Sequence, residues 1–120
     1  MNAHFSVISL WAEDVQQAAH FYKNVLGLPL AAHHGGTPHF DLDGINLVIL
    51  HGIPQPVREA HPDRFPLFAL TVDDFDSTLN RLAAHRVQLP WGIEHNSGTR
   101  WVMFYDPAGN LIELVDQHMK

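Results

Sequence analysis

The alternation of apolar and polar positions predicts a strand near the start of the chain and a helix directly after it. In residues 5–11 (Phe-Ser-Val-Ile-Ser-Leu-Trp), Ile8 and Leu10 fall on one face of an extended chain and the odd-numbered residues fall on the other. From Val15 to Val25 the apolar residues instead recur three or four positions apart, which is the spacing of one helix face. The chain therefore begins with a strand followed by a helix.

Two residues mark the ends of this helix. Asp14 is a good N-cap, because its carboxylate can accept a hydrogen bond from the free amides of the first turn. Gly27 supplies the stop, because glycine adopts a positive φ without steric cost, and Pro29 follows just beyond it. These signals bound the helix at both ends.

A hairpin is predicted after the helix. Residues 33–38 are a loop by composition, and two short extended segments follow at 40–42 and 45–50. Asp43 and Gly44 lie between the two segments, and this pair is typical of the tight turns that join antiparallel strands.

The second half of the chain repeats the pattern of the first half after a proline-rich segment. Residues 54–66 contain four prolines, which interrupt helices and strand ladders, so we interpret this segment as a connector. A shift of sixty positions places Leu10 on Leu70 and Asp14 on Asp74. A strand and a capped helix are therefore predicted again.

The hairpins repeat as well. A shift of sixty-four positions places residues 46–50 on residues 110–114. If residues 106–109 close a four-residue loop, Tyr105 pairs with Asn110 in the second hairpin. Two copies of one β-α-β-β-β unit then account for the whole chain.

Length and composition narrow the class of protein. A chain of 120 residues with 46% hydrophobic composition suffices for one domain with its own core. The absence of cysteine excludes disulfides and thiolate metal sites and is consistent with a reducing cytoplasm. A formal net charge of -6 gives no basic surface for nucleic acid, and no apolar run is long enough to span a membrane. We expect a cytoplasmic protein without nucleic-acid or membrane partners.

Residues 21–28 (Phe-Tyr-Lys-Asn-Val-Leu-Gly-Leu) and 106–114 (Asp-Pro-Ala-Gly-Asn-Leu-Ile-Glu-Leu) together resemble the vicinal oxygen chelate superfamily. That group includes glyoxalase I, bleomycin resistance proteins, extradiol dioxygenases and fosfomycin-resistance thiol transferases. The resemblance implies an α+β fold of two tandem β-α-β-β-β modules, whose curved mixed sheets form a cup with the helices outside, commonly completed by a homodimer. A single domain, residues 1–120, would then comprise a first module of about residues 1–53 and a second of about 67–120.

The resemblance also implies a metal site whose ligands come from the first and last strands of each module. By the repeat, these positions are Val7, Ile49, Leu67 and Glu113, and only the last of them can bind a metal. We therefore expect no cofactor. The alternative is a displaced divalent-metal site that uses Glu113 and His51, because His51 lies two residues beyond Ile49 and points to the same side.

Alternation along the strands predicts which residues line the cup. Arg100 shares its inward parity with Phe104, so it would pair with Glu113, bind an anionic group of the ligand, or meet only water. Leu47, Ala69, Thr71 and Leu111 are placed on the same inward face. The predicted ligand-binding residues are Phe5, Val7, Ser9, Ile49, His51, Leu67, Arg100, Phe104 and Glu113.

The expected function is metal-independent binding of a small molecule, in the manner of the bleomycin-resistance branch. The alternative is an enzyme, namely a lyase, isomerase, dioxygenase or transferase that uses a displaced metal or Glu113 as a general base. Burial raises the pKa of a carboxyl group, so Glu113 could act as a base without any metal. The sequence leaves both classes open. It does not identify the ligand, because the shape of the predicted pocket depends on segments 52–66 and 94–99, whose conformations do not follow from the sequence.

Overall fold

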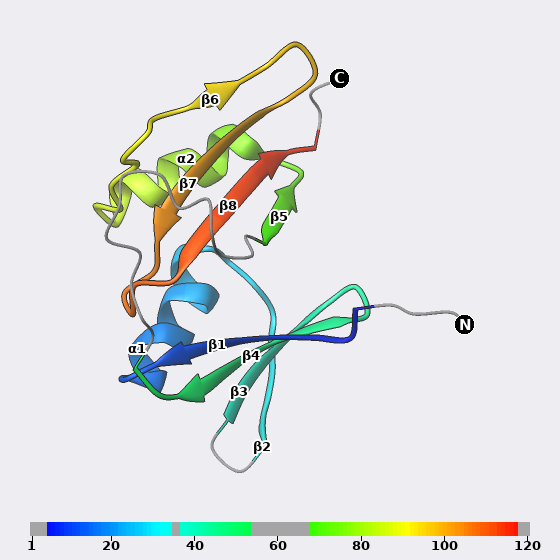
Figure 1. Cartoon of the computed structure of the whole chain (residues 1–120), viewed down its shortest axis with the longest axis vertical. Helices are drawn as coiled ribbons and strands as arrows, with labels where there is room; N and C mark the ends of the chain where they lie inside the picture. The colour runs from blue at the N-terminus through cyan, green and yellow to red at the C-terminus, as the bar shows by residue number, and fades with distance from the viewer. Residues whose placement is uncertain (1–4, 35–36, 54–67, 118–120) are drawn as a thin grey trace. The chain divides into compact units, whose positions relative to one another are not determined.

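The computed structural model shown in Figure 1 describes residues 5–34, 37–53 and 68–117. The chain divides into two compact units, Met1–Gln55 and Pro56–Lys120, which are called the first and second unit below. Within the described ranges, no helix is both long enough and apolar enough to cross a membrane.

The first unit is a four-stranded sheet with one helical segment against it. Its elements are β1 (Val7–Ala12), α1 (Val15–His20), the π-helical turn η1 (Phe21–Val25), β2 (Leu30–His34), β3 (Thr37–Leu42) and β4 (Ile45–His51). The strand order is β1-β4-β3-β2, with β1 parallel to β4 and the other pairs antiparallel.

The second unit repeats this arrangement (Figure 1). Its elements are β5 (Ala69–Val72), α2 (Phe75–Ala84), β6 (Glu94–His95), β7 (Arg100–Tyr105) and β8 (Leu111–Asp116). The strand order is β5-β8-β7-β6, and again only the first and last strands of the unit pair in parallel. The predicted α+β fold of two tandem β-α-β-β-β modules is confirmed.

Both predicted helix caps are present. The carboxylate of Asp14 accepts a hydrogen bond of 3.0 Å from the amide of Gln17, and that of Asp74 accepts one of 3.0 Å from the amide of Ser77. Gly27 follows η1 with a φ of 74°, so the predicted glycine stop is also confirmed. These caps satisfy amides and carbonyls that the helix itself leaves without partners.

The hairpin of the first unit is longer than the sequence suggested. Asp43 and Gly44 form the expected turn, with φ values of 56° and 90°. The loop predicted at residues 33–38 is wrong, however, because His33 pairs with Pro38 and His34 pairs with Thr37 across β2 and β3. Backbone pairing with β3 extends β2 into a segment whose composition favours a loop.

The core of the first unit lies between its sheet and its helical segment. Leu10 and Ile49 are adjacent on β1 and β4, and Tyr22 packs on Phe40 with ring centroids 6.1 Å apart. The buried apolar residues are Leu10, Ala12, Ala18, Ala19, Phe21, Tyr22, Val25, Phe40, Leu47 and Ile49. The face of the sheet that carries Leu10 and Ile49 is therefore the helix face of this unit.

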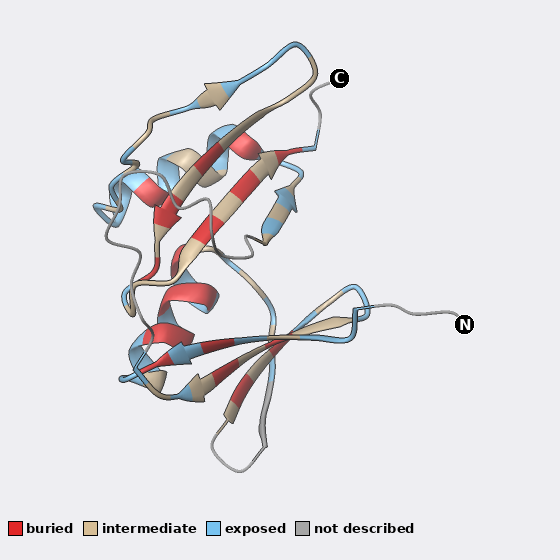
Figure 2. Ribbon diagram, viewed as in Figure 1, coloured by how far each residue is buried: buried red, intermediate tan, exposed pale blue. Residues whose placement is uncertain are grey.

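The second unit has an equivalent core. Figure 2 shows buried residues alternating with less buried ones along β7 and β8. The buried apolar residues of this unit are Phe75, Leu82, Val102, Phe104, Ile112 and Leu114. Period-2 alternation leaves Met103 and Glu113 on the opposite side, which is called the open face.

Candidate functional site

The turn between β7 and β8 sets the geometry of the candidate site. The carboxylate of Asp106 accepts hydrogen bonds from the amides of Ala108, at 3.0 Å, and Asn110, at 2.8 Å. It also accepts one of 3.0 Å from the side-chain amide of Asn110, and Gly109 supplies a φ of 97°. The loop therefore holds five residues, and Tyr105 pairs with Leu111 rather than with Asn110.

This one-residue difference reverses the predicted faces of β7. Met103 lies opposite Glu113, and Phe104 lies opposite Ile112. Phe104 is 0% exposed, so its predicted place among the ligand-binding residues is wrong. Arg100 has the same parity as Phe104 and belongs to the helix face too.

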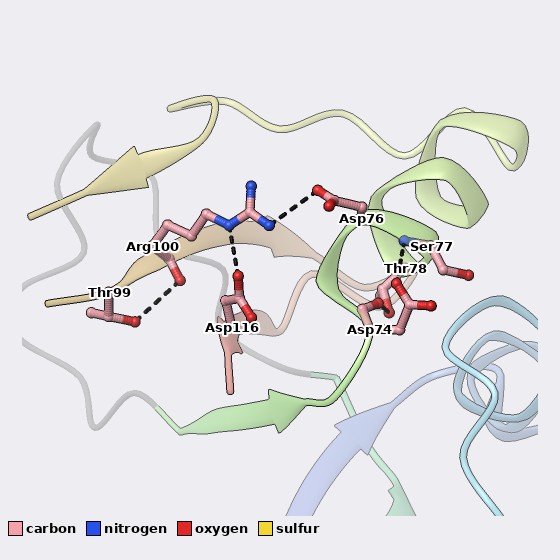
Figure 3. A network of polar contacts seen from close by, with 7 residues as sticks. All are labelled: Asp74, Asp76, Ser77, Thr78, Thr99, Arg100 and Asp116. Carbon is pink, nitrogen blue, oxygen red and sulfur yellow. Dashed lines mark hydrogen bonds and ion pairs between the residues drawn. The ribbon is translucent and has the colours of Figure 1, made fainter. Parts of the chain in front are cut away.

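Arg100 forms hydrogen bonds with two aspartates (Figure 3), and it also contacts an aromatic ring. Its Nε donates a hydrogen bond of 2.7 Å to Asp116, its Nη2 donates one of 3.1 Å to Asp76, and its guanidinium carbon lies 4.6 Å from the ring centre of Phe75. The hydrogen bond to Asp116 raises the pKa of Arg100 further above its usual range. The predicted pairing of Arg100 with Glu113 is wrong, because these side chains lie on opposite faces of the sheet.

The register of the first unit corrects a second assignment. Leu10 pairs with Ile49, and Leu70 pairs with Leu114, so the shift between the last strands is sixty-five (114 minus 49). Ile49 is 1% exposed on the helix face, so its predicted position in the ligand site is wrong. The same applies to Leu47, which is also 1% exposed. Val48, not Ile49, is the counterpart of Glu113.

The other predicted residues of the first unit are exposed. Phe5 is 78% exposed and Val7 is 50% exposed, and Ser9 is also on the exposed side of β1. His51 ends β4 opposite Ala12, with the parity of Ile49 and not that of Val7. Leu67, the remaining predicted residue, lies outside the described residues.

Glu113 lies on the open face of the second unit, as alternation from β8 predicted. Its direct neighbours on that face are Ala69 of β5 and Met103 of β7. Burial raises the pKa of the Glu113 carboxyl above its usual value, and the negative charge of Glu94 raises it further. A half-buried carboxyl therefore lies in the centre of a largely apolar sheet face.

Glu94 is a candidate residue that the sequence did not indicate. It begins the two-residue strand β6 and pairs with Trp101, which shares the open face with Met103 and Glu113. Its Oε1 atom is buried and has no hydrogen-bond partner among the described residues. Residues 94–99 have loop composition, and β6 is too short to show any alternation, so no sequence signal placed Glu94 beside Glu113.

Aromatic side chains accompany this carboxylate pair. Trp101 is the cross-strand neighbour of Glu94, and Tyr105 continues the same face toward the turn. The ring of Trp91 lies against that of Tyr105, with centroids 6.2 Å apart and planes inclined by 48°. The open face of the second unit thus combines two carboxylates with aromatic and apolar surface.

Hard metal donors are few on this face. Among the described residues, no group of three or more histidine, aspartate or glutamate side chains is placed to hold a metal ion. Glu113 and His51, the pair predicted for a displaced site, belong to different units.

Several solved structures share this fold. A lactoylglutathione lyase from Agrobacterium tumefaciens is 19% identical, with a TM-score of 0.72 and 100% of both chains covered. The antibiotic binding protein TnmS3 from a Streptomyces species is 26% identical, with a TM-score of 0.73 and 96% of both chains covered. A mutant fosfomycin resistance protein from Listeria monocytogenes, complexed with manganese(II) and a dihydroxypropylphosphonic acid, is 21% identical, with a TM-score of 0.74, 95% of this chain and 90% of that chain covered.

The sequence comparison agrees with the fold. Residues 4–114 match the sequence profile of the Glyoxalase/Bleomycin resistance protein/Dioxygenase superfamily, and the chain belongs to this superfamily.

Proposed function

We propose that this protein binds a small molecule against the open face of the second unit, with Glu113 as a polar contact and without a bound metal ion. The observation that carries the proposal is the chemistry of the positions implied for the metal ligands. Val7 of β1 and Val48 of β4 offer no donor atoms, whereas Glu113 retains a carboxylate. A tightly held divalent ion generally needs three or four protein ligands, so this donor set does not fit a metal.

The surroundings of Glu113 support a binding role. Ala69, Met103 and Trp101 provide apolar surface on the same face, and the carboxylate provides one directional contact within it. Small-molecule sites commonly have this composition, in which apolar side chains supply contact area and a few polar groups fix orientation. The 26% identity to an antibiotic binding protein over 96% of both chains points in the same direction.

The test combines a ligand screen with a substitution. A thermal-shift screen of antibiotics and metabolites should yield a ligand, and Glu113→Gln should weaken its binding at least about tenfold, or about 1.4 kcal/mol. Glu13→Gln, which removes the same charge at an exposed position of the first unit, should leave affinity unchanged. Elemental analysis after dialysis completes the test, because a stoichiometric transition metal in the purified protein would contradict the proposal.

The raised pKa of Glu113 favours one alternative function. A carboxyl group with a raised pKa is a better general base when it is ionised, and the solved structures that share this fold include a lyase. The alternative is therefore a lyase, isomerase, dioxygenase or transferase in which Glu113 is the base. Turnover of a ligand from the screen, lost in Glu113→Gln while binding persists, would identify the protein as an enzyme of this kind.

We also infer that two chains associate. Phe5, Val7 and Trp11 are at least half exposed on or beside β1, which is an edge strand of its sheet. Apolar side chains at an open sheet edge favour association with another chain. Light scattering at micromolar concentration should give the mass of a homodimer, and a monomeric mass would contradict this inference.

A further inference from the structure

We propose that Glu94 and Glu113 together bind a positively charged group of the ligand, so that the site selects a small organic cation. This inference rests on the proposed binding function and adds the ligand's charge to it. Glu94 is a residue to which neither the sequence pattern nor the family match assigns a role.

The geometry of three adjacent strands brings the two carboxylates to one site. β8 carries Glu113, β7 carries Met103 directly opposite it, and β6 carries Glu94 opposite Trp101. Glu94 and Glu113 are also offset by two residues along the strands, so with strands about 4.8 Å apart and about 3.3 Å per residue their backbones lie about 12 Å apart across β7. Two glutamate side chains on the same face can approach each other over that distance, and the effect of Glu94 on the pKa of Glu113 agrees with this proximity.

One carboxylate oxygen of Glu94 accepts no hydrogen bond from the described residues. Its Oε1 is buried, and no described residue donates a hydrogen bond to it. A buried carboxylate oxygen without a donor is destabilising, so its presence calls for a donor that the folded chain does not supply. An ammonium or guanidinium group supplies donors and positive charge at once.

Arg100, the cationic residue of β7, binds two aspartates on the other side of the sheet. Arg100 contacts Asp116 and Asp76 on the helix face, so it does not neutralise the pair on the open face. Two like charges near each other in a half-buried site are destabilising unless a proton or a cation neutralises one of them. A cationic ligand would therefore bind where the protein has left an excess of negative charge.

The residues around the pair suit an organic cation better than a metal ion. Trp101 is the cross-strand neighbour of Glu94, and an aromatic face attracts ammonium and guanidinium groups. Met103, directly opposite Glu113, is a soft apolar side chain and not a ligand for hard ions. Two carboxylates alone fall short of the oxygen ligands that a divalent ion requires.

The experiment uses benzylamine, which is cationic at neutral pH, and benzyl alcohol, its neutral counterpart. The full chain is labelled with 13C in its methionine methyl groups, and the Met103 resonance is assigned with Met103→Leu. Because Met103 lies beside Glu113, its methyl signal reports binding at this face. Benzylamine should shift the signal, and benzyl alcohol should bind at least about tenfold more weakly.

Three substitutions separate the role of the pair from general electrostatics. Glu94→Gln and Glu113→Gln should each weaken benzylamine binding at least about tenfold, while Glu13→Gln should leave it unchanged. The melting temperature of each variant, measured on the same sample, checks that the fold is retained. An equal response to benzylamine and benzyl alcohol, unaffected by either glutamate, would overturn the inference and leave the proposed binding function intact.

A titration with manganese(II) chloride distinguishes a metal from an organic cation. Paramagnetic broadening of the Met103 signal at a stoichiometric amount of manganese, lost in both glutamate variants and without any response to benzylamine, would assign the pair to a metal. That result would overturn both this inference and the metal-independent function. The absence of any Met103 response to benzylamine would overturn the inference as well.

Discussion

The two β-α-β-β-β units share their helix faces and differ on their open faces. Ile49 and Leu114 occupy equivalent buried positions next to leucines of the first strand of each unit. One residue earlier, on the open face, Val48 of the first unit corresponds to Glu113 of the second. The difference teaches that packing against a helix constrains one side of the sheet, while the other side is free to acquire different chemistry in each copy.

The largest effect is expected from equivalent substitutions in the two cores. Leu47→Ala and Ile112→Ala should each lower the free energy of unfolding by about 2–5 kcal/mol, because both side chains are about 1% exposed or less. Chemical denaturation of the two variants provides the measurement. If one substitution lowers the free energy of unfolding by less than half as much as the other, the two cores are not equivalent.

A smaller effect is expected from the aspartates that bind Arg100, which have no counterpart among the described contacts of the first unit. Asp116→Asn should lower the melting temperature clearly, because the Asp116 side chain is 4% exposed and leaves the guanidinium without its closest charged partner. Asp76→Asn should leave it nearly unchanged, because that carboxylate is 75% exposed to water. Equal decreases in melting temperature would show that the burial of Asp116 does not make its contact with Arg100 more stabilising than that of Asp76.

The helix caps should behave alike in both units. Asp14→Ala and Asp74→Ala each remove one hydrogen bond of 3.0 Å to the first turn, and each should cost about 0.5–2 kcal/mol. Ligand affinity should be retained in both variants, because neither carboxylate lies on an open face. Unchanged melting temperatures would mean that these caps do not stabilise their helices.

The smallest effect on stability is expected at the position that differs between the open faces, and it depends on pH. Folding raises the pKa of Glu113, so the wild type is stabilised by the protonated carboxyl at low pH and loses this contribution as the pH rises through the folded-state pKa. Glu113→Gln should therefore melt at a higher temperature than the wild type at pH 8, and the difference should disappear below the ordinary glutamate pKa of about 4.3.

The matched control for this prediction is Val48→Gln in the first unit. It introduces the same amide at the equivalent position, where the wild type has no titratable group. Its effect on the melting temperature should be the same at both pH values. A difference between Glu113→Gln and the wild type that is constant with pH would contradict the assignment of the effect to Glu113 ionisation.

The sequence was sufficient for most of the elements, the caps and the duplication, because these depend on local spacing and turn chemistry. It did not indicate β2, which enters the predicted loop, or the two-residue strand β6. It was not sufficient for the faces of β4 and β7, which were each displaced by one residue. Leu111, Ile112, Leu114 and Val115 are all apolar, so the hydrophobic pattern of β8 does not choose a face for its neighbour. Loop length decided the register instead, and Glu94 became visible only when β6 was paired with β7.

The turn held by Asp106 has a consequence for how this protein can vary. Five residues, 106–110, separate the paired Tyr105 and Leu111, and the hydrogen bonds to Asp106 hold this loop length. A four-residue loop in the same sequence would pair Tyr105 with Asn110, and the side chains of one face of β7 would exchange places with those of the other. In that register Val102 would lie opposite Glu113, and Met103 would turn toward the helix. This loop therefore determines which side chains of β7 reach the site, although it does not belong to the site, and homologues with a different turn length should be aligned by register before their site residues are compared.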